Sequence, residues 1–178
     1  GNTTTVDATD TTWGQYLRLV VMERTLPTCE ITSPNDNAFV NSTTPTIEFT
    51  VSDAGSGVHP SAVYLKIDDG TAVPVTPSFN EAGTVGTCTY TPSALSQGPH
   101  TVTVYCTDYD GNTSEEVTST FKVDTLPPVL NVSYPSNNVL VNTSSINVTG
   151  STSDEGYTTV AVTVQVNENS PITATVNQ

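Results

Sequence analysis

The sequence predicts an all-β protein built as a sandwich of two antiparallel sheets. Apolar residues alternate with Thr and Ser over short runs, which is the period of half-buried strands, and no helical period occurs. Thr and Val, which favour strands, are abundant, and twelve prolines and eleven glycines supply turns. The strand-like runs follow one another at intervals of about 8–12 residues, as the strands of a sandwich do.

Seven strands are expected in the central part of the chain, at residues 28–32, 46–52, 62–68, 72–76, 85–90, 100–107 and 116–123. Alternation assigns an inward face to most of them. The side chains expected in the core are Ile47, Phe49, Val51, Val63, Leu65, Ile67, Val102, Val104, Cys106, Phe121 and Val123. The segment Asp68-Asp69-Gly70 predicts a hairpin turn after the third strand.

An internal repeat predicts how the chain is divided. TLPTCEITSPNDNAFVN at 25–41 is similar to TLPPVLNVSYPSNNVLVN at 125–142, an offset of about 100 residues, the size of one sandwich. TVDATD at 5–10 is likewise similar to TVYCTD at 103–108. The predicted division is therefore a complete sandwich at 26–126, preceded by the closing strands of one repeat (1–25) and followed by the opening strands of another (127–178).

Several motifs resemble those of a known family. DAGSGV at 53–58 resembles a turn of bacterial immunoglobulin-like repeats, and GPHTVTV at 98–104, with Thr107-Asp108 and Gly111-Asn112 after it, resembles their strand and following loop. FKVDTLPP at 121–128 resembles their linker. The resemblance implies immunoglobulin-like β-sandwiches in tandem repeats of about 100 residues. It also implies large secreted or cell-surface proteins, where such modules serve as stalks, adhesins or accessory parts of polysaccharide-degrading enzymes.

Charge and motif content exclude several function classes. Lys and Arg number four against eighteen Asp and Glu, a formal charge of −14, so nucleic acid and anionic membrane surfaces are not expected partners. No apolar run approaches the roughly 20 residues that span a bilayer. The only histidines, His59 and His100, are expected to be structural, and no catalytic motif occurs, so the protein is not expected to be an enzyme.

Acidic loops suggest a structural calcium site. In an immunoglobulin topology two loops meet at the pole where the preceding domain joins, which brings together Asp53, Asp108, Asp110 and Asn112, with Glu23 nearby. At the next junction Asp124 would approach Asp154 and Glu155. Calcium takes about 6–8 oxygen ligands, so it would relieve the repulsion and stiffen the junctions. The alternative is that these are ordinary turn residues.

The three cysteines, Cys29, Cys88 and Cys106, allow at most one internal disulfide. Cys29 and Cys106 are expected at the same pole, where an oxidising compartment would favour a bond between them. Cys88 is the rival partner, and three buried thiols are the third alternative.

The expected function is structural or adhesive, in an extracellular or cell-surface protein, and the alternative is a carbohydrate-binding accessory module of a secreted polysaccharide-active enzyme. The expected partners are neighbouring repeats and a host or glycan surface ligand. Incomplete end repeats would expose sheet edges, so head-to-tail or strand-swapped self-association is also expected, unless the ends pack onto the complete domain as extra strands.

Overall fold

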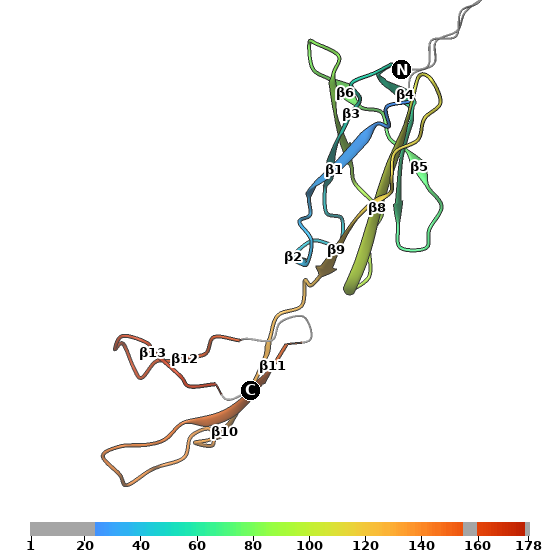
Figure 1. Cartoon of the computed structure of the whole chain (residues 1–178). Coiled ribbons are helices and arrows are strands. Elements are labelled where there is room, and N and C mark those ends of the chain that lie inside the picture. The colour runs from blue at the N-terminus through green and yellow to red at the C-terminus, as the bar shows by residue number, and fades with distance from the viewer. Residues whose placement is uncertain (1–23, 155–159, 177–178) are drawn as a thin grey trace, which may run out of the picture.

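The computed structural model describes residues 24–154 and 160–176. The predictions for residues 1–23, and those for Glu23 and Glu155, lie outside these ranges. Two packed sheets form the sandwich (Figure 1). One has the order β1-β3-β7-β6, and its strands are Thr28–Ser33, Ile47–Ser52, Val85–Tyr90 and Ser78–Phe79. The other has the order β2-β9-β8-β4-β5, and its strands are Ala38–Val40, Val117–Val123, Gly98–Asp108, Val58–Ile67 and Val73–Pro74.

The first sheet follows the predicted alternation. In β3 Ile47, Phe49 and Val51 are fully buried, while Glu48 between them is exposed. β1 and β7 pair antiparallel with β3 on its two sides, and Cys88 of β7 lies opposite Phe49. β1 is an edge strand whose inner side chains, Cys29 and Ile31, pack against the core. Strict alternation thus gives the sheet one apolar face.

The second sheet is built around β8, its longest strand. β4 and β9 pair antiparallel with β8, so the apolar faces of three strands lie side by side. Together the two sheets bury a continuous set of apolar side chains: Ile47, Phe49, Val51, Val58, Val63, Leu65, Val75, Cys88, Val102, Val104, Cys106, Phe121 and Val123. The predicted all-β sandwich is confirmed, and the expected inward residues lie in this core, with Ile67 partly buried against it.

Three local features differ from the prediction. β2 and β6 were not predicted, because strands of three and two residues are too short to show alternation. After β1 the chain turns at Asn37, with φ of 61°, and crosses to the other sheet, where β2 runs parallel to β9. β4 begins at Val58 rather than at 62, because Val58 pairs with Asp108 before an irregularity that ends at Val63.

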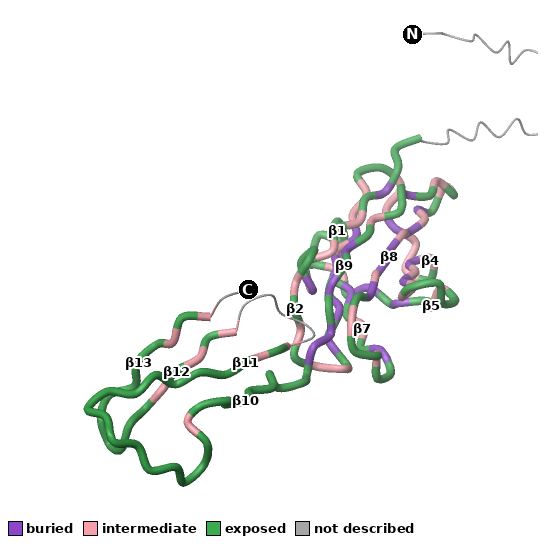
Figure 2. Tube along the Cα trace, turned by 90° about the horizontal axis from the view of Figure 1, so that it is seen from below, coloured by how far each residue is buried: buried purple, intermediate pink, exposed green. Residues whose placement is uncertain are grey.

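Residues 127–154 and 160–176 lie outside the sandwich, beyond the end where β9 leaves it (Figure 1). They contain two hairpin-like pairs: β10 (Val129–Tyr134) with β11 (Thr149–Ser153), and β12 (Thr163–Val164) with β13 (Ile172–Thr173). Their side chains are mostly exposed, whereas burial is concentrated in the sandwich (Figure 2). In the described ranges no helix is long and apolar enough to cross a membrane.

Candidate functional site

Two acidic loops lie side by side at the N-terminal pole, the end of the sandwich where β1 begins. They are the loop 53–57 after β3 and the loop 108–112 after β8. The Tyr109 amide donates to the Gly57 carbonyl at 3.0 Å, and the Asp110 amide donates to Ser56 Oγ at 3.2 Å. The rings of Tyr109 and His59 lie 4.8 Å apart. The loops thus meet as the sequence predicts.

Asp53 organises the first loop with one carboxylate oxygen. Its Oδ2 accepts hydrogen bonds from the amides of Gly55 at 3.0 Å and Gly57 at 2.7 Å. Gly57 has φ of 86°, a conformation that a residue without Cβ adopts at little cost. The other oxygen, Oδ1, is buried and has no hydrogen-bond partner among the described residues.

Asp108 and Asn112 close the second loop. Asp108 is only 2% exposed, and its carboxylate accepts from the Asn112 amide at 2.8 Å and from Asn112 Nδ2 at 2.7 Å. The Asp108 amide in turn donates to the Asn112 carbonyl at 3.0 Å. Gly111, with φ of 89°, makes the tight turn between them. Both carboxylate oxygens of Asp108 therefore serve the loop itself.

The calcium ligands predicted for the N-terminal pole belong to these two loops. Within residues 24–154 and 160–176, no three His, Cys, Asp or Glu side chains gather into a group that could hold a metal ion. Glu23, the fifth residue of the predicted N-terminal set, lies outside the described residues. Among the residues that the structure describes at this pole, Asp53 Oδ1 is buried without a hydrogen-bond partner.

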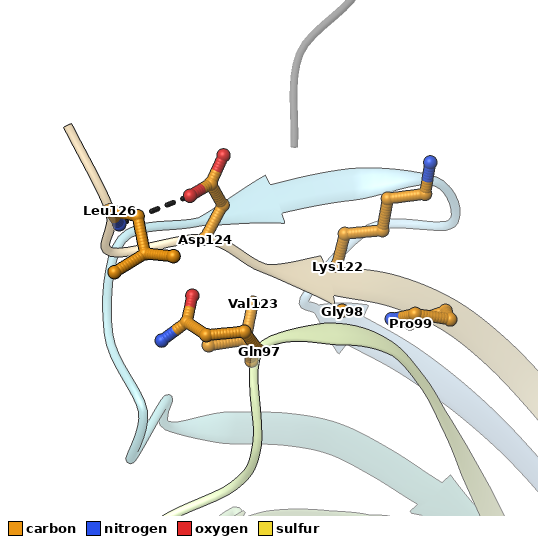
Figure 3. A pocket seen from close by; sticks show the side chains of 7 residues that line it. All are labelled: Gln97, Gly98, Pro99, Lys122, Val123, Asp124 and Leu126. Carbon is orange, nitrogen blue, oxygen red and sulfur yellow. Dashed lines mark hydrogen bonds between the residues drawn. The ribbon is translucent and has the colours of Figure 1, made fainter. Parts of the chain in front are cut away.

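A second acidic position lies at the C-terminal pole, where β9 leaves the sandwich. Asp124 is 7% exposed, and its Oδ1 accepts from the Leu126 amide at 3.1 Å (Figure 3). Its Oδ2 is buried without a partner in the described structure. A cavity of about 170 Å³ adjoins it, lined by Gln97, Gly98, Pro99, Lys122, Val123, Asp124 and Leu126 (Figure 3). Asp154, its predicted companion, directly follows β11.

Gln97 is a residue of this pole that sequence analysis missed. Its side chain forms two hydrogen bonds with Thr125, accepting from the amide at 2.9 Å and donating to Oγ1 at 2.8 Å. These bonds connect the segment that follows β9 to the segment that precedes β8. A glutamine in a loop carries no local signal of such a role, because its partner lies 28 positions away.

His100, which the sequence analysis expects to be structural, has Asp68 as its partner. The ring is buried, with Nδ1 at 2.8 Å from Asp68 Oδ2 and Nε2 at 3.0 Å from the Ser96 carbonyl. Burial lowers the pKa of His100, but the hydrogen bonds to Asp68 and Ser96 and the charge of Asp68 outweigh it and raise this pKa overall.

The cysteines are three thiols, two of which lie in contact. Cys29 Sγ and Cys106 Sγ are 3.3 Å apart, and Ser114 Oγ lies 3.6 Å from Cys29 Sγ. Burial, with a smaller contribution from the charge of Cys29, raises the pKa of Cys88 to about 12. Ser114 is another residue without a local sequence signal.

Several solved structures are similar to part of this chain. Among solved structures, dimeric latent PorU from Porphyromonas gingivalis is 23% identical over 61% of this chain, with a TM-score of 0.45. The fibronectin(III)-like modules of CbhA from Clostridium thermocellum are 23% identical over 54% of it, with a TM-score of 0.41, and 96% of their chain is covered. CopC from Methylosinus trichosporium OB3b is 20% identical over 57% of it and 94% of its own chain, with a TM-score of 0.38.

The chain spans only 12% of the length of the PorU chain. No curated protein sequence matches it significantly. The profile of the bacterial Ig-like domain family (Big_13) matches residues 26–125, which is the sandwich described above. Domains of this family are typical of surface and secreted proteins and are typically non-catalytic modules. The chain belongs to the bacterial Ig-like domain family.

Proposed function

We propose that the chain is a structural or adhesive module of a large extracellular or cell-surface protein, in which Ig-like units follow one another. The observation that carries this proposal is a recurring strand register. Thr28 pairs with Ser52 in the sandwich, and Val129 pairs with Ser153 outside it, so both partners are displaced by 101 positions. The register irregularities at Ile31/Ser33 and Val132/Tyr134 are displaced by the same number.

A second pairing supports the same division. Tyr64 lies opposite Pro74 in the β4–β5 pair, and Thr163 lies opposite Thr173 in the β12–β13 pair, so both partners are displaced by 99 positions. We infer from these registers that β10, β11, β12 and β13 are counterparts of β1, β3, β4 and β5. Counterparts of β7, β8 and β9 would complete them into a second sandwich.

A chain extended after Gln178 by a copy of residues 80–126 tests this division. The appended strands should convert the exposed hairpins into a second cooperative unit, seen as an added transition in calorimetry and as new amide protection in β10 and β11. The matched control carries Phe121→Asp in the appended copy, which removes a core side chain. If the extension and its control behave alike, residues 127–178 do not open a second module.

Calcium at the junctions is the second part of the proposal. Two buried carboxylate oxygens that have no partner in the described part of the chain, Asp53 Oδ1 and Asp124 Oδ2, support it, since calcium binds carboxylate and carbonyl oxygens. Asp124 is a better candidate calcium ligand than the N-terminal set, because both carboxylate oxygens of Asp108 already accept hydrogen bonds from Asn112. The ligands proposed for the N-terminal pole remain Asp53, Asp108, Asp110 and Asn112, and those for the C-terminal pole Asp124 and Asp154.

Calorimetric titration with calcium, together with melting in calcium and in chelator, tests this part. Calcium should raise the melting temperature. Asp124→Asn should abolish the effect if the C-terminal pole binds, and Asp53→Asn should abolish it if the N-terminal pole does. An unchanged melting temperature with no binding heat would exclude calcium at both poles.

Self-association is a further expected property. The pairs β10–β11 and β12–β13 line a groove of about 540 Å³ with apolar side chains that include Leu130, Val132, Val148 and Val164. Exposed apolar strands attract pairing partners. The proposed occupant is residues 1–25 of a second copy, which contain TVDATD at 5–10, a segment similar to TVYCTD at 103–108 in β8. Light scattering should show oligomers that are lost when these residues are removed, and a monomer at high concentration would refute this.

A carbohydrate-binding accessory module is the alternative, and a stacked pair of tyrosines favours it. Tyr64 and Tyr105 lie on neighbouring strands of the second sheet, with ring centroids 5.3 Å apart. Aromatic faces are platforms for apolar contact with ligands. A glycan array distinguishes the alternatives: binding that Tyr105→Ala abolishes would favour the accessory module, and absence of binding favours the structural one.

A further inference from the structure

Two of the three thiols face each other across the sandwich. Cys29 lies on β1 of the first sheet, and Cys106 lies on β8 of the second, 77 positions further along the chain. Their sulfurs are 3.3 Å apart, which is a direct contact. Only a small approach separates this arrangement from the roughly 2.05 Å of a disulfide bond. The contact therefore joins the two sheets through their inward side chains.

Strand order argues against Cys88 as the partner of Cys29. Cys29 lies opposite Val51 on β3, whereas Cys88 lies opposite Phe49 on the far side of β3. Two strand spacings, about 9–10 Å, thus separate β1 from β7. Disulfides join Cα atoms no more than about 7 Å apart. Of the three alternatives that the sequence leaves open, the geometry favours the pair Cys29 and Cys106.

The two sulfurs also differ in access. Cys29 is half-buried on an edge strand, while Cys106 is fully buried. A hydrogen bond with Cys106 lowers the pKa of Cys29; burial opposes this, and Ser114 adds to the lowering. The hydrogen bond with Cys29 and burial raise the pKa of Cys106. Cys29 is consequently the thiol better suited to react first with an external reagent.

We propose that Cys29 and Cys106 form a disulfide that locks the two sheets together at the N-terminal pole. Formation of this disulfide in the native setting rests on the extracellular function proposed above, since disulfides persist in oxidising compartments. The reaction is thiol–disulfide exchange with an external disulfide, R–S–S–R. The Cys29 thiolate attacks one sulfur and releases RS⁻, which takes up a proton. Cys106 then loses its proton, attacks Cys29 Sγ and releases the second thiol.

The exchange is balanced, because two cysteine thiols are oxidised while one external disulfide is reduced to two thiols. Cys88 does not take part and stays a buried thiol. The bond would enclose residues 29–106, which include every strand of the first sheet and most of the second. In a tandem array under tension, a force applied to the N-terminal side of the domain could not detach β1 from the sandwich beyond Cys29. The disulfide would therefore serve as a mechanical staple.

The purified chain of 178 residues, incubated with oxidised glutathione under native conditions, tests the bond independently of cellular location. Peptide mapping of the wild type should show Cys29 linked to Cys106 and one thiol, Cys88, that alkylates after unfolding. Cys88→Ser is the matched control and should keep the bond, with no thiol left to alkylate. Cys29→Ser and Cys106→Ser should each lose it, and far-UV circular dichroism verifies that both variants are folded.

The effect on stability distinguishes a staple from an incidental bond. In Cys88→Ser, oxidation should raise the melting temperature by about 10 °C or more relative to the reduced protein. The proposal is overturned if oxidised Cys88→Ser still has two thiols that alkylate after unfolding, if Cys88 is found in the bond of the wild type, or if the bond forms without raising the melting temperature. A cross-linked module that shows no sign of tandem neighbours would refute the proposed function while leaving the bond in place.

Discussion

Replacement of Asp68 by Asn should remove a pH-dependent part of the stability of the sandwich. Asp68 follows β4 with φ of 52°, a left-handed conformation that Asn also tolerates. Its Oδ1 accepts from the Thr101 amide at 2.8 Å, and an Asn oxygen can keep this bond. The substitution therefore removes the charge that faces His100 with little change of shape.

The two pKa shifts determine the pH range in which the pair of His100 and Asp68 stabilises the folded state. The pKa of His100 is raised, so its contribution is fully present below the unfolded value of about 6.5 and is lost as pH rises through the folded value. Burial raises the pKa of Asp68, but the hydrogen bonds from Thr101 and His100 and the charge of His100 lower it overall. Its contribution is present above about 3.9 and is lost as pH falls through the folded value. The pair therefore stabilises most between about pH 4 and pH 6.5.

The loss of stability expected in Asp68→Asn is limited, because solvent reaches one member of the pair. His100 has 6% of its side chain exposed, but Asp68 has 47%, which screens the charge. A hydrogen bond to a charged group contributes about 1.5–3 kcal/mol, and an exposed ion pair about 0–1 kcal/mol. The expected loss in Asp68→Asn is about 1 kcal/mol near pH 5.5, or a fall of about 4–8 °C in melting temperature. Near pH 9, where the imidazole is neutral, the two proteins should melt at nearly the same temperature.

Proton NMR gives the direct assay, because the chain has only two histidines and the His100 ring signal can be assigned by substitution. The His100 ring signal should titrate at a lower pH in Asp68→Asn than in the wild type. Identical titration of His100 in both proteins would refute the reasoning, as would a melting difference that does not depend on pH.

Three other substitutions probe packing. Phe49→Ala should cost about 3–5 kcal/mol in chemical denaturation, because the ring is fully buried between the sheets; a loss below 1 kcal/mol would mean that this core is loosely packed. Gly86→Ala should cost about 1–3 kcal/mol, since a Cβ there would lie 2.8 Å from Pro77 Cβ and 3.0 Å from Phe79 and Val51. Its control is Val85→Ala at the exposed neighbouring position, and equal melting temperatures for the two variants would contradict the expected overpacking. Gly150→Ala should abolish amide protection in β10 and β11 without changing the melting of the sandwich, because a Cβ would meet the Asn131 backbone; hydrogen exchange that is unchanged would argue against this close approach.

The sequence by itself determined the fold class and the faces of the main strands. In β3, β8 and β9 alternate residues are apolar, and this local period decides which side chains point inward wherever one face is buried. Asp108, Gly111 and Asn112 likewise form a loop whose bonds close within five residues, so their motif could be recognised from sequence alone. Short strands such as β2 escaped prediction, because three residues show no period.

Only the tertiary structure decided which distant groups meet. His100 contacts Asp68, which lies 32 positions away in the chain. Gln97 bonds to Thr125 across 28 positions, and Cys29 contacts Cys106 across 77 positions. Such pairs depend on strand order and on how one sheet faces the other, and neither leaves a local pattern in the chain. Alternation shows that Cys29 and Cys106 both point inward, but the position of β1 opposite β8 brings their sulfurs into contact and leaves Cys88 on the far side of β3. The sequence thus determined which residues line the interior, and the packing of the two sheets decided which of them touch.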